Sequence, residues 1–168
     1  MRQRPVILLV ALAVVAALFV IFTARELPPE VGSHFAGGGE PDDWMPRESY
    51  VTLMVLFILV YPAFMLLAFN WLPRRWTHLV NIPHRDYWLA PERKEESLKF
   101  LASHGWWFCC LLIPTVAGVH YAIVVGHRSQ PPELSLPLFL TVLGCFGAGL
   151  TVWGIKLFQR FHKPEQPS

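Results

Sequence analysis

The sequence carries little charge for its length, and the charges that it has avoid four long apolar stretches. Only 15% of the 168 residues are Asp, Glu, Lys or Arg, whereas 54% are hydrophobic, and the mean hydropathy is +0.39. Soluble domains of ordinary composition carry about 25% charged residues. The shortage of charge therefore excludes an ordinary soluble globular domain.

Cysteine is also scarce, and its placement argues against two further classes. The three cysteines, Cys109, Cys110 and Cys145, all fall inside apolar stretches. They show neither the pattern of a secreted disulfide framework nor the spacing of a metal site. We expect them to pack as small hydrophobic side chains.

Ionisable residues are missing from the middle of every apolar stretch. This absence of Asp, Glu, Lys and Arg counts against an ion-coupled transporter, because such carriers need ionisable groups at depth. His104 and His120 lie near the two ends of the third stretch, where we expect them to hydrogen-bond neighbouring helices. The sequence also offers no glycine-rich phosphate cradle and no Ser-His-Asp or Cys-His order.

The apolar stretches predict the fold. A helix needs about 20 apolar residues to cross a bilayer, and four stretches come near that length. We predict one all-α membrane domain over residues 1–168. Its helices are expected at about 5–23, 50–72, 100–125 and 136–157, with an outer loop at 24–49 and an inner loop at 73–99. The first stretch follows a basic start, so a cleaved signal peptide is the alternative to a retained helix.

The basic residues predict the orientation. With a cytoplasmic N-terminus, eleven of the 14 Lys and Arg residues face the cytoplasm, and only Arg25, Arg47 and Arg128 lie outside. Short loops rich in Lys and Arg stay in the cytoplasm. Both termini are therefore predicted inside, and the acidic loop at 24–49 is predicted outside.

The outer loop holds residue types that bind metal ions or sense pH. His34 and Asp42 flank a glycine triplet, and His127 of the second outer turn could join them in space. The loop contains no close pair such as His-x-x-His. The alternative is a folded recognition loop, in which His34 bonds the backbone, an aspartate caps a turn and Trp44 anchors at the bilayer interface.

The inner loop contains a dense group of polar and aromatic residues that could bind a partner, a lipid headgroup or a nucleotide phosphate. The candidate residues for a partner site are Asn81, Asp86, Tyr87, Trp88 and Pro91. Pro91 and the acidic residues after it also predict the start of a helix that runs into the third apolar stretch. The alternative is a segment that lies at the bilayer interface, anchored by Tyr87 and Trp88.

The fourth apolar stretch carries a small-xxx-small pair, Gly144 and Ala148. Such pairs let helices approach closely. We expect this pair to support packing within the bundle, or contact with a protein partner or a second copy of the chain.

The outer loop resembles a known motif, LPxxVxxHFxxxGxPDxW. The residues that carry the resemblance are Leu27, Pro28, Val31, His34, Phe35, Gly39, Pro41, Asp42 and Trp44. The motif is similar to that of a bacterial membrane domain of unknown function, which also forms the N-terminal part of the Sdp-type toxin-immunity and signalling protein. With the neighbouring helices the likeness extends over residues 1–72. Gly32 and Arg47 depart from the pattern, at positions where proline and lysine are common.

The resemblance implies a multi-pass protein of the bacterial inner membrane with an outward recognition loop. The candidate residues of the recognition loop are His34, Phe35, Gly39, Pro41, Asp42 and Trp44. We expect Phe35, Trp44 and the glycine turn to form the recognition surface, with His34 and Asp42 orienting it. The six helices associated with the immunity protein are not present here, so the resemblance does not by itself imply immunity. The inner segment 81–93 is also similar to stand-alone members of the group.

These features favour one hypothesis and leave two alternatives. We expect a non-enzymatic, receptor-like or immunity-like protein that binds a ligand or peptide outside and a partner inside. One alternative is a small metal-dependent membrane enzyme that uses His34, Asp42 and His127. The other is a structural accessory subunit that packs through Gly144 and Ala148. We predict the lipid bilayer as a partner, no cofactor and no nucleic acid.

Overall fold

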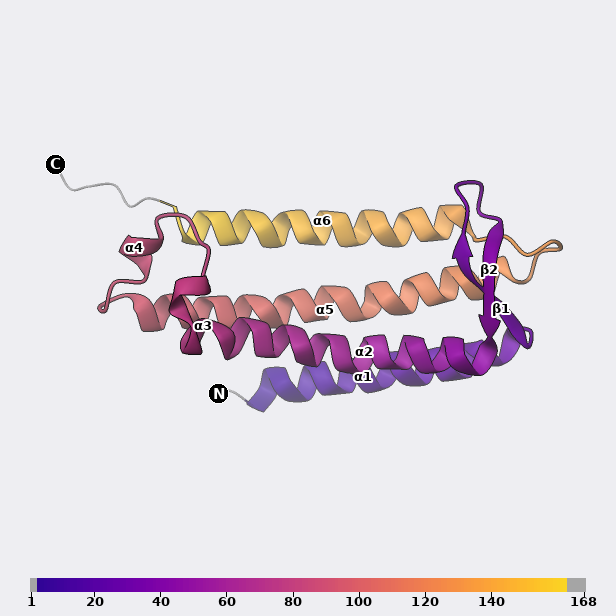
Figure 1. Cartoon of the computed structure of the whole chain (residues 1–168), viewed down its shortest axis with the longest axis horizontal. Coiled ribbons are helices and arrows are strands. Elements are labelled where there is room, and N and C mark those ends of the chain that lie inside the picture. The colour runs from indigo at the N-terminus through magenta and orange to yellow at the C-terminus, as the bar shows by residue number, and fades with distance from the viewer. Residues whose placement is uncertain (1–2, 163–168) are drawn as a thin grey trace.

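The computed structural model describes residues 3–162, with side chains from Val6 onward, and four long helices form most of it (Figure 1). Each is long and apolar enough to cross a membrane, which confirms the four predicted helices. Their bounds are Gln3–Thr23 for α1, Arg47–Asn70 for α2, Lys94–Gly126 for α5 and Leu136–Arg160 for α6. Arg2, Lys163 and the side chain of Arg4, which support the predicted orientation, lie outside the described part.

Two helices begin earlier than the apolar stretches that predicted them. α2 begins at Arg47, and α5 begins at Lys94 because Lys and Glu, although charged, favour helix formation. Glu95 and Glu96 in the first turn of α5 also stabilise the positive end of its dipole. The 33 residues of α5 span about 50 Å at a rise of about 1.5 Å per residue. α5 is therefore longer than a hydrocarbon core of about 30 Å requires.

Short elements connect the long helices. A 3₁₀ turn, Ala24–Glu26, leads from α1 into an antiparallel hairpin of β1, Glu30–Phe35, and β2, Pro41–Pro46. The sequence predicts a structured loop here but not its strands. The segment after α2 contains α3, Leu72–Arg75, a 3₁₀ turn, Thr77–Leu79, and α4, Arg85–Trp88.

The loops divide between the two ends of the bundle. The hairpin and the turn between α5 and α6 lie at one end, which we call the hairpin end (Figure 1). α3, α4 and both ends of the described chain lie at the other, which we call the α3 end. Because both ends of the described chain lie at the same end of the bundle, this division agrees with four helices that each cross a membrane once. Which end faces the cytoplasm remains a prediction.

α5 lies at the centre of the bundle and contacts each of the other three long helices. α1, α2 and α5 enclose a core of buried residues that includes Val20, Ile58 and Ile113. α2 and α5 approach closely at Gly105, where an added Cβ would lie 2.5 Å from the Cβ of Phe69. Large apolar side chains are exposed along α1, α2 and α6 and at Trp107 of α5, as in helices that face a bilayer.

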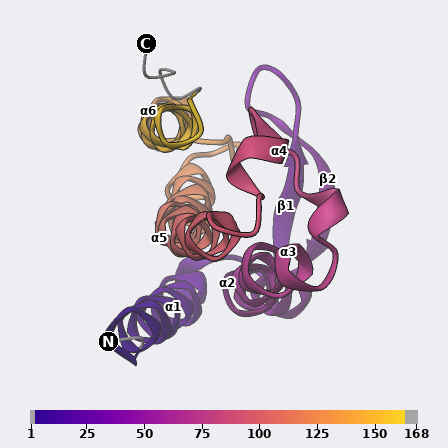
Figure 2. The same cartoon turned by 90° about the vertical axis from the view of Figure 1, so that its left-hand side faces the viewer.

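α6 packs chiefly on α5, on the side away from α1 (Figure 2). None of its residues is fully buried. Gly118 of α5 meets Val142, and Gly149 meets Leu111, so small residues do bring these two helices together. A Cβ added at Gly144 would meet no other part of the described chain within 4 Å, and Ala148 is exposed. The predicted Gly144–Ala148 pair therefore does not pack within the bundle, and its role toward a partner remains a prediction.

Candidate functional site

The hairpin holds all six residues of the predicted recognition loop. In its register Val31 pairs with Met45 and Gly32 with Trp44, before irregularities on either side of His34. The tip closes with two backbone hydrogen bonds, from Ala36 N–H to the Glu40 carbonyl and from Gly39 N–H to the Ala36 carbonyl, both 2.8 Å. Short irregular strands of this kind lack the regular alternation that identifies a strand in a sequence.

Gly39 is the position at which the tip requires glycine. Its φ of +93° is strained for a residue with a side chain. Its carbonyl also accepts a hydrogen bond of 2.7 Å from the N–H of Leu134, in the turn before α6. The glycine of the motif therefore both closes the tip and joins it to the second turn at the hairpin end.

His127 anchors the hairpin to the helix bundle. Its Nδ1–H donates to the Ile123 carbonyl at 2.9 Å, and its Nε2 accepts from the N–H of Gly32 at 3.0 Å. The rings of Phe35 and Trp44 meet the imidazole edge to face, with centroids 6.5 and 6.1 Å away. Both ring nitrogens are thus engaged by the protein. This leaves His127 no free lone pair for a metal ion in this conformation.

A salt bridge between two exposed side chains also stabilises the hairpin end. Arg128 donates to the Glu26 carboxylate at 2.7 Å and so joins the turn after α5 to the turn after α1. The hydrogen bond and the charge of Glu26 hold the pKa of the Arg128 guanidinium above its usual value. Arg128 therefore remains protonated throughout the physiological pH range. Arg47 at the start of α2 adds a hydrogen bond of 2.8 Å to the Leu27 carbonyl.

His34 and Asp42 form a pair on the open side of the hairpin. His34 Nδ1 lies 2.6 Å from Asp42 Oδ1, and the two side chains are 73% and 49% exposed. The expectation that His34 bonds the backbone is replaced by this side-chain pair. Because the carboxylate accepts from Nδ1–H, the neutral ring presents Nε2 as a hydrogen-bond acceptor. Among the described residues none reaches that nitrogen, so the pair can receive a donor from a ligand.

The candidate metal set does not come together in the described part of the chain. No group of three or more His, Cys, Asp or Glu side chains there is arranged to hold a metal ion. His34 and Asp42 could supply two ligands, but the ring nitrogens of His127 are engaged elsewhere. The arrangement is better suited to hydrogen-bonded recognition than to a closed metal centre.

A buried polar network lies just below the hairpin. His120 of α5 bonds Tyr50 of α2 through Nδ1 and Thr23 of α1 through Nε2, at 2.8 Å each. The Thr23 hydroxyl lies 2.7 Å from the Phe19 carbonyl, to which it can only donate. Thr23 must then accept from His120 Nε2–H, and Tyr50 must donate to Nδ1. This single arrangement satisfies every group, and it confirms the expectation that His120 bonds neighbouring helices.

The inner candidate residues form a compact structure at the α3 end. Trp88 packs against Phe161, which is fully buried, and its carbonyl accepts from Ser97 Oγ at 2.8 Å. Arg93 lies over the ring of Tyr87, 3.9 Å from its centroid. The exposed candidates are Asn81, Asp86, Tyr87 and Pro91. A surface for a partner thus remains, but Trp88 serves the packing between α4, α5 and the end of α6.

Sequence reasoning missed several residues that shape the hairpin end. Tyr50, Thr23 and the Arg128–Glu26 pair were not singled out. Tyr50 offered one signal, because a tyrosine at the end of an apolar stretch often finds a buried hydrogen-bond partner. Glu26 and Arg128 offered none, because opposite charges far apart in a chain do not reveal that they meet.

Comparison with known proteins gives little further guidance. No model of a known protein family matches the chain, and no solved structure matches it. An uncharacterized protein of Archaeoglobus fulgidus is 28% identical to it in an alignment 156 residues long, which covers 83% of this chain and 78% of that protein. This relative comes from an archaeon and carries no stated activity. The resemblance of the outer loop to the Sdp-type group remains a prediction, and function must be argued from the site.

Proposed function

We propose that this chain is a non-enzymatic membrane protein that recognises an extracytoplasmic ligand or peptide through its hairpin. The observation that carries the proposal is that the hairpin is held in place by the rest of the protein while one polar pair in it stays exposed. The hairpin is tied to the bundle through His127 and, at its tip, to the turn before α6 through Gly39, whereas the His34–Asp42 pair is exposed. A fixed scaffold with an open polar pair is what specific recognition requires, because little ordering entropy is lost on binding.

The predicted orientation supports the same proposal. Basic residues concentrate at the α3 end, so the hairpin would face away from the cytoplasm. The exposed residues of the inner segment, Asp86 and Tyr87 among them, would then meet a cytoplasmic partner. This arrangement is receptor-like or immunity-like, as the resemblance of the loop implies.

Cysteine labelling tests the orientation first. Gly38 has open space around it, so Gly38→Cys should fold normally. In intact cells a membrane-impermeant maleimide should label Gly38→Cys but should label Asp86→Cys only after the membrane is opened. The reverse pattern would overturn the orientation and with it an extracytoplasmic ligand.

Photocrosslinking tests recognition itself. A benzophenone amino acid placed at Gly38 should give a discrete adduct in the membranes of the native host. The same amino acid at Phe64, an exposed residue in the middle of α2, is the matched control for contact with lipid or bystander proteins. The adduct at Gly38 should weaken when His34→Ala or Asp42→Asn is added. An adduct shared with Phe64, or insensitive to both changes, would contradict the proposal.

Elemental analysis separates this proposal from the metal-dependent enzyme. Under the proposal, the purified protein and its His34→Ala variant contain no stoichiometric transition metal. A stoichiometric metal that is lost in His34→Ala would favour the enzyme instead.

The open face of α6 favours a second candidate, a structural accessory subunit. A Cβ added at Gly144 or Gly147 would meet no other part of the described chain within 4 Å. α6 packs chiefly on α5, so this face of α6 is open. If another helix covers this face, Gly144→Leu should release the chain from a larger complex while hairpin variants remain bound. If Gly144→Leu stays in the complex as fully as the natural protein does, the result counts against the accessory subunit.

A further inference from the structure

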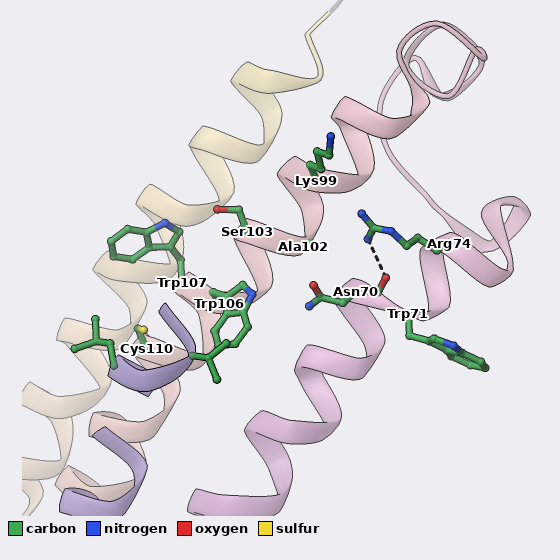
Figure 3. A pocket seen from close by; sticks show the side chains of 11 residues that line it. Asn70, Trp71, Arg74, Lys99, Ala102, Ser103, Trp106, Trp107 and Cys110 are labelled. Carbon is green, nitrogen blue, oxygen red and sulfur yellow. Dashed lines mark hydrogen bonds between the residues drawn. The ribbon is translucent and has the colours of Figure 1, made fainter. Parts of the chain in front are cut away.

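A cleft of about 710 Å³ opens between α1, α2 and α5 at the α3 end, far from the hairpin (Figure 3). Its deeper walls are apolar and come from Val6 and Leu8 of α1 and from Trp106 and Cys110 of α5. The rim carries two cations, Arg74 of α3 and Lys99 of α5. The cleft is thus charged at the end of the bundle and apolar toward its middle.

One acidic residue lies against both cations of the rim. Glu95 Oε1 is 3.5 Å from a guanidinium nitrogen of Arg74 and 3.8 Å from Nζ of Lys99. Arg74 also donates to the Asn70 carbonyl at 3.1 Å, and its side chain extends from α3 toward α5 (Figure 3). Two cations against one carboxylate leave the rim with a net positive charge. The Glu95 side chain is 63% exposed, so it can turn away toward water.

The position of the cleft indicates the depth of its occupant. Trp71 lines it, is exposed and lies close to Arg74 in the chain, and exposed tryptophans beside basic residues mark the interface level of a bilayer. A molecule that fills the cleft would therefore have its polar part at the membrane surface. Its apolar part would extend into the hydrocarbon core between the helices.

We propose that the cleft binds a phospholipid with an anionic headgroup from the membrane leaflet at the α3 end. The lipid phosphate lies between Arg74 and Lys99, and one acyl chain follows the apolar wall past Trp106. Net positive charge at the rim favours an anionic lipid over a zwitterionic one. A free phosphate ion could use the rim but would gain nothing from the apolar walls.

Glu95 acts as a competitor for the lipid phosphate. In the structure it occupies the two cations that the phosphate needs, so binding requires its displacement. Replacing Glu95 should therefore tighten lipid binding, whereas replacing the cations should weaken it. General attraction to a charged surface would give effects of the same sign, so charge changes placed outside the cleft are needed to distinguish it from a built site.

The test is native mass spectrometry of the full chain in detergent with phosphatidylglycerol, phosphatidylcholine or inorganic phosphate. Phosphatidylglycerol should bind more tightly than phosphatidylcholine. Arg74→Gln with Lys99→Gln should weaken the phosphatidylglycerol complex by at least about fivefold, the effect of one basic residue near an anionic lipid surface. Glu95→Gln should strengthen it. The control is Arg75→Gln with Lys156→Gln, which removes the same amount of positive charge outside the cleft. It should change phosphatidylglycerol binding little.

A cleft-filling variant separates lipid binding from binding of phosphate alone. Ala102→Phe would place an aromatic ring in the cleft and occupy part of it while leaving both cations in place. It should reduce phosphatidylglycerol binding, and inorganic phosphate should not compete at equal concentration. Three results would each overturn the proposal. They are an equal loss of phosphatidylglycerol binding in the two double variants, unchanged binding in Ala102→Phe, and full competition by phosphate.

Discussion

His104 and Trp153 exchange two hydrogen bonds across the interface between α5 and α6. His104 Nε2 lies 2.9 Å from the Trp153 carbonyl, and Trp153 Nε1 donates to the His104 carbonyl at 3.0 Å. Their rings also pack together, with centroids 4.8 Å apart. α6 has no fully buried residue, and this reciprocal pair adds specific hydrogen bonds to its packing on α5.

Breaking that pair should loosen α6. Trp153→Phe keeps an aromatic ring but removes the indole donor, and we expect it to lower the free energy of unfolding by about 0.5–1.5 kcal/mol. Trp107→Phe, at a residue 65% exposed, is the control and should have no effect. Unfolding in mixed detergent micelles measures both. Equal stability of the two variants would show that the reciprocal bonds contribute nothing.

The His120 network should show strong coupling between its members. His120→Leu leaves the buried Tyr50 hydroxyl without its acceptor, which should cost about 1–2 kcal/mol. Adding Tyr50→Phe removes the stranded group, so the double variant should be more stable than the sum of the single changes predicts. A double-mutant cycle from equilibrium unfolding checks this. Additive losses would contradict the direct pairing of Tyr50 with His120.

Glycines in different surroundings should respond differently to alanine. Gly105→Ala places a Cβ against Phe69 and should destabilise the α2–α5 contact by about 1–3 kcal/mol. Gly144→Ala enters open space and should leave the monomer unchanged or more stable by about 0.5–1 kcal/mol. Thermal unfolding of both variants in detergent provides the comparison. A destabilising Gly144→Ala would indicate that another helix covers that face.

The hairpin should depend on His127 for order but not on His34. His127→Leu removes the acceptor for Gly32 N–H. The loss of one hydrogen bond should speed amide exchange at Gly32 by up to about tenfold. His34→Ala changes only an exposed pair and should leave the exchange rate of the hairpin near its original value. Similar acceleration in both variants would show that the hairpin is not anchored through His127.

The four helices could be predicted because their cause is local. A bilayer demands about 20 apolar residues in each crossing segment, whatever the rest of the chain does. The stretches that contain Val20, Ile58, Ile113 and Leu150 meet that demand residue by residue, so their number and approximate limits follow from the sequence. α2 and α5 begin before their apolar stretches, because charged helix formers extend them. For α5 the sequence indicated this extension through Pro91 and the acidic residues after it.

The arrangement of the site was decided by the tertiary structure. His127 meets the N–H of Gly32 across 95 positions of the chain, and His120 meets Thr23 across 97. The residue types were visible in advance, and the expectation that His120 would bond another helix was sound. Their partners were not visible, because a hydrogen bond depends on the register at which packed helices meet. No periodicity within one segment records that register, so the sequence by itself determined the helices and the packing determined the site.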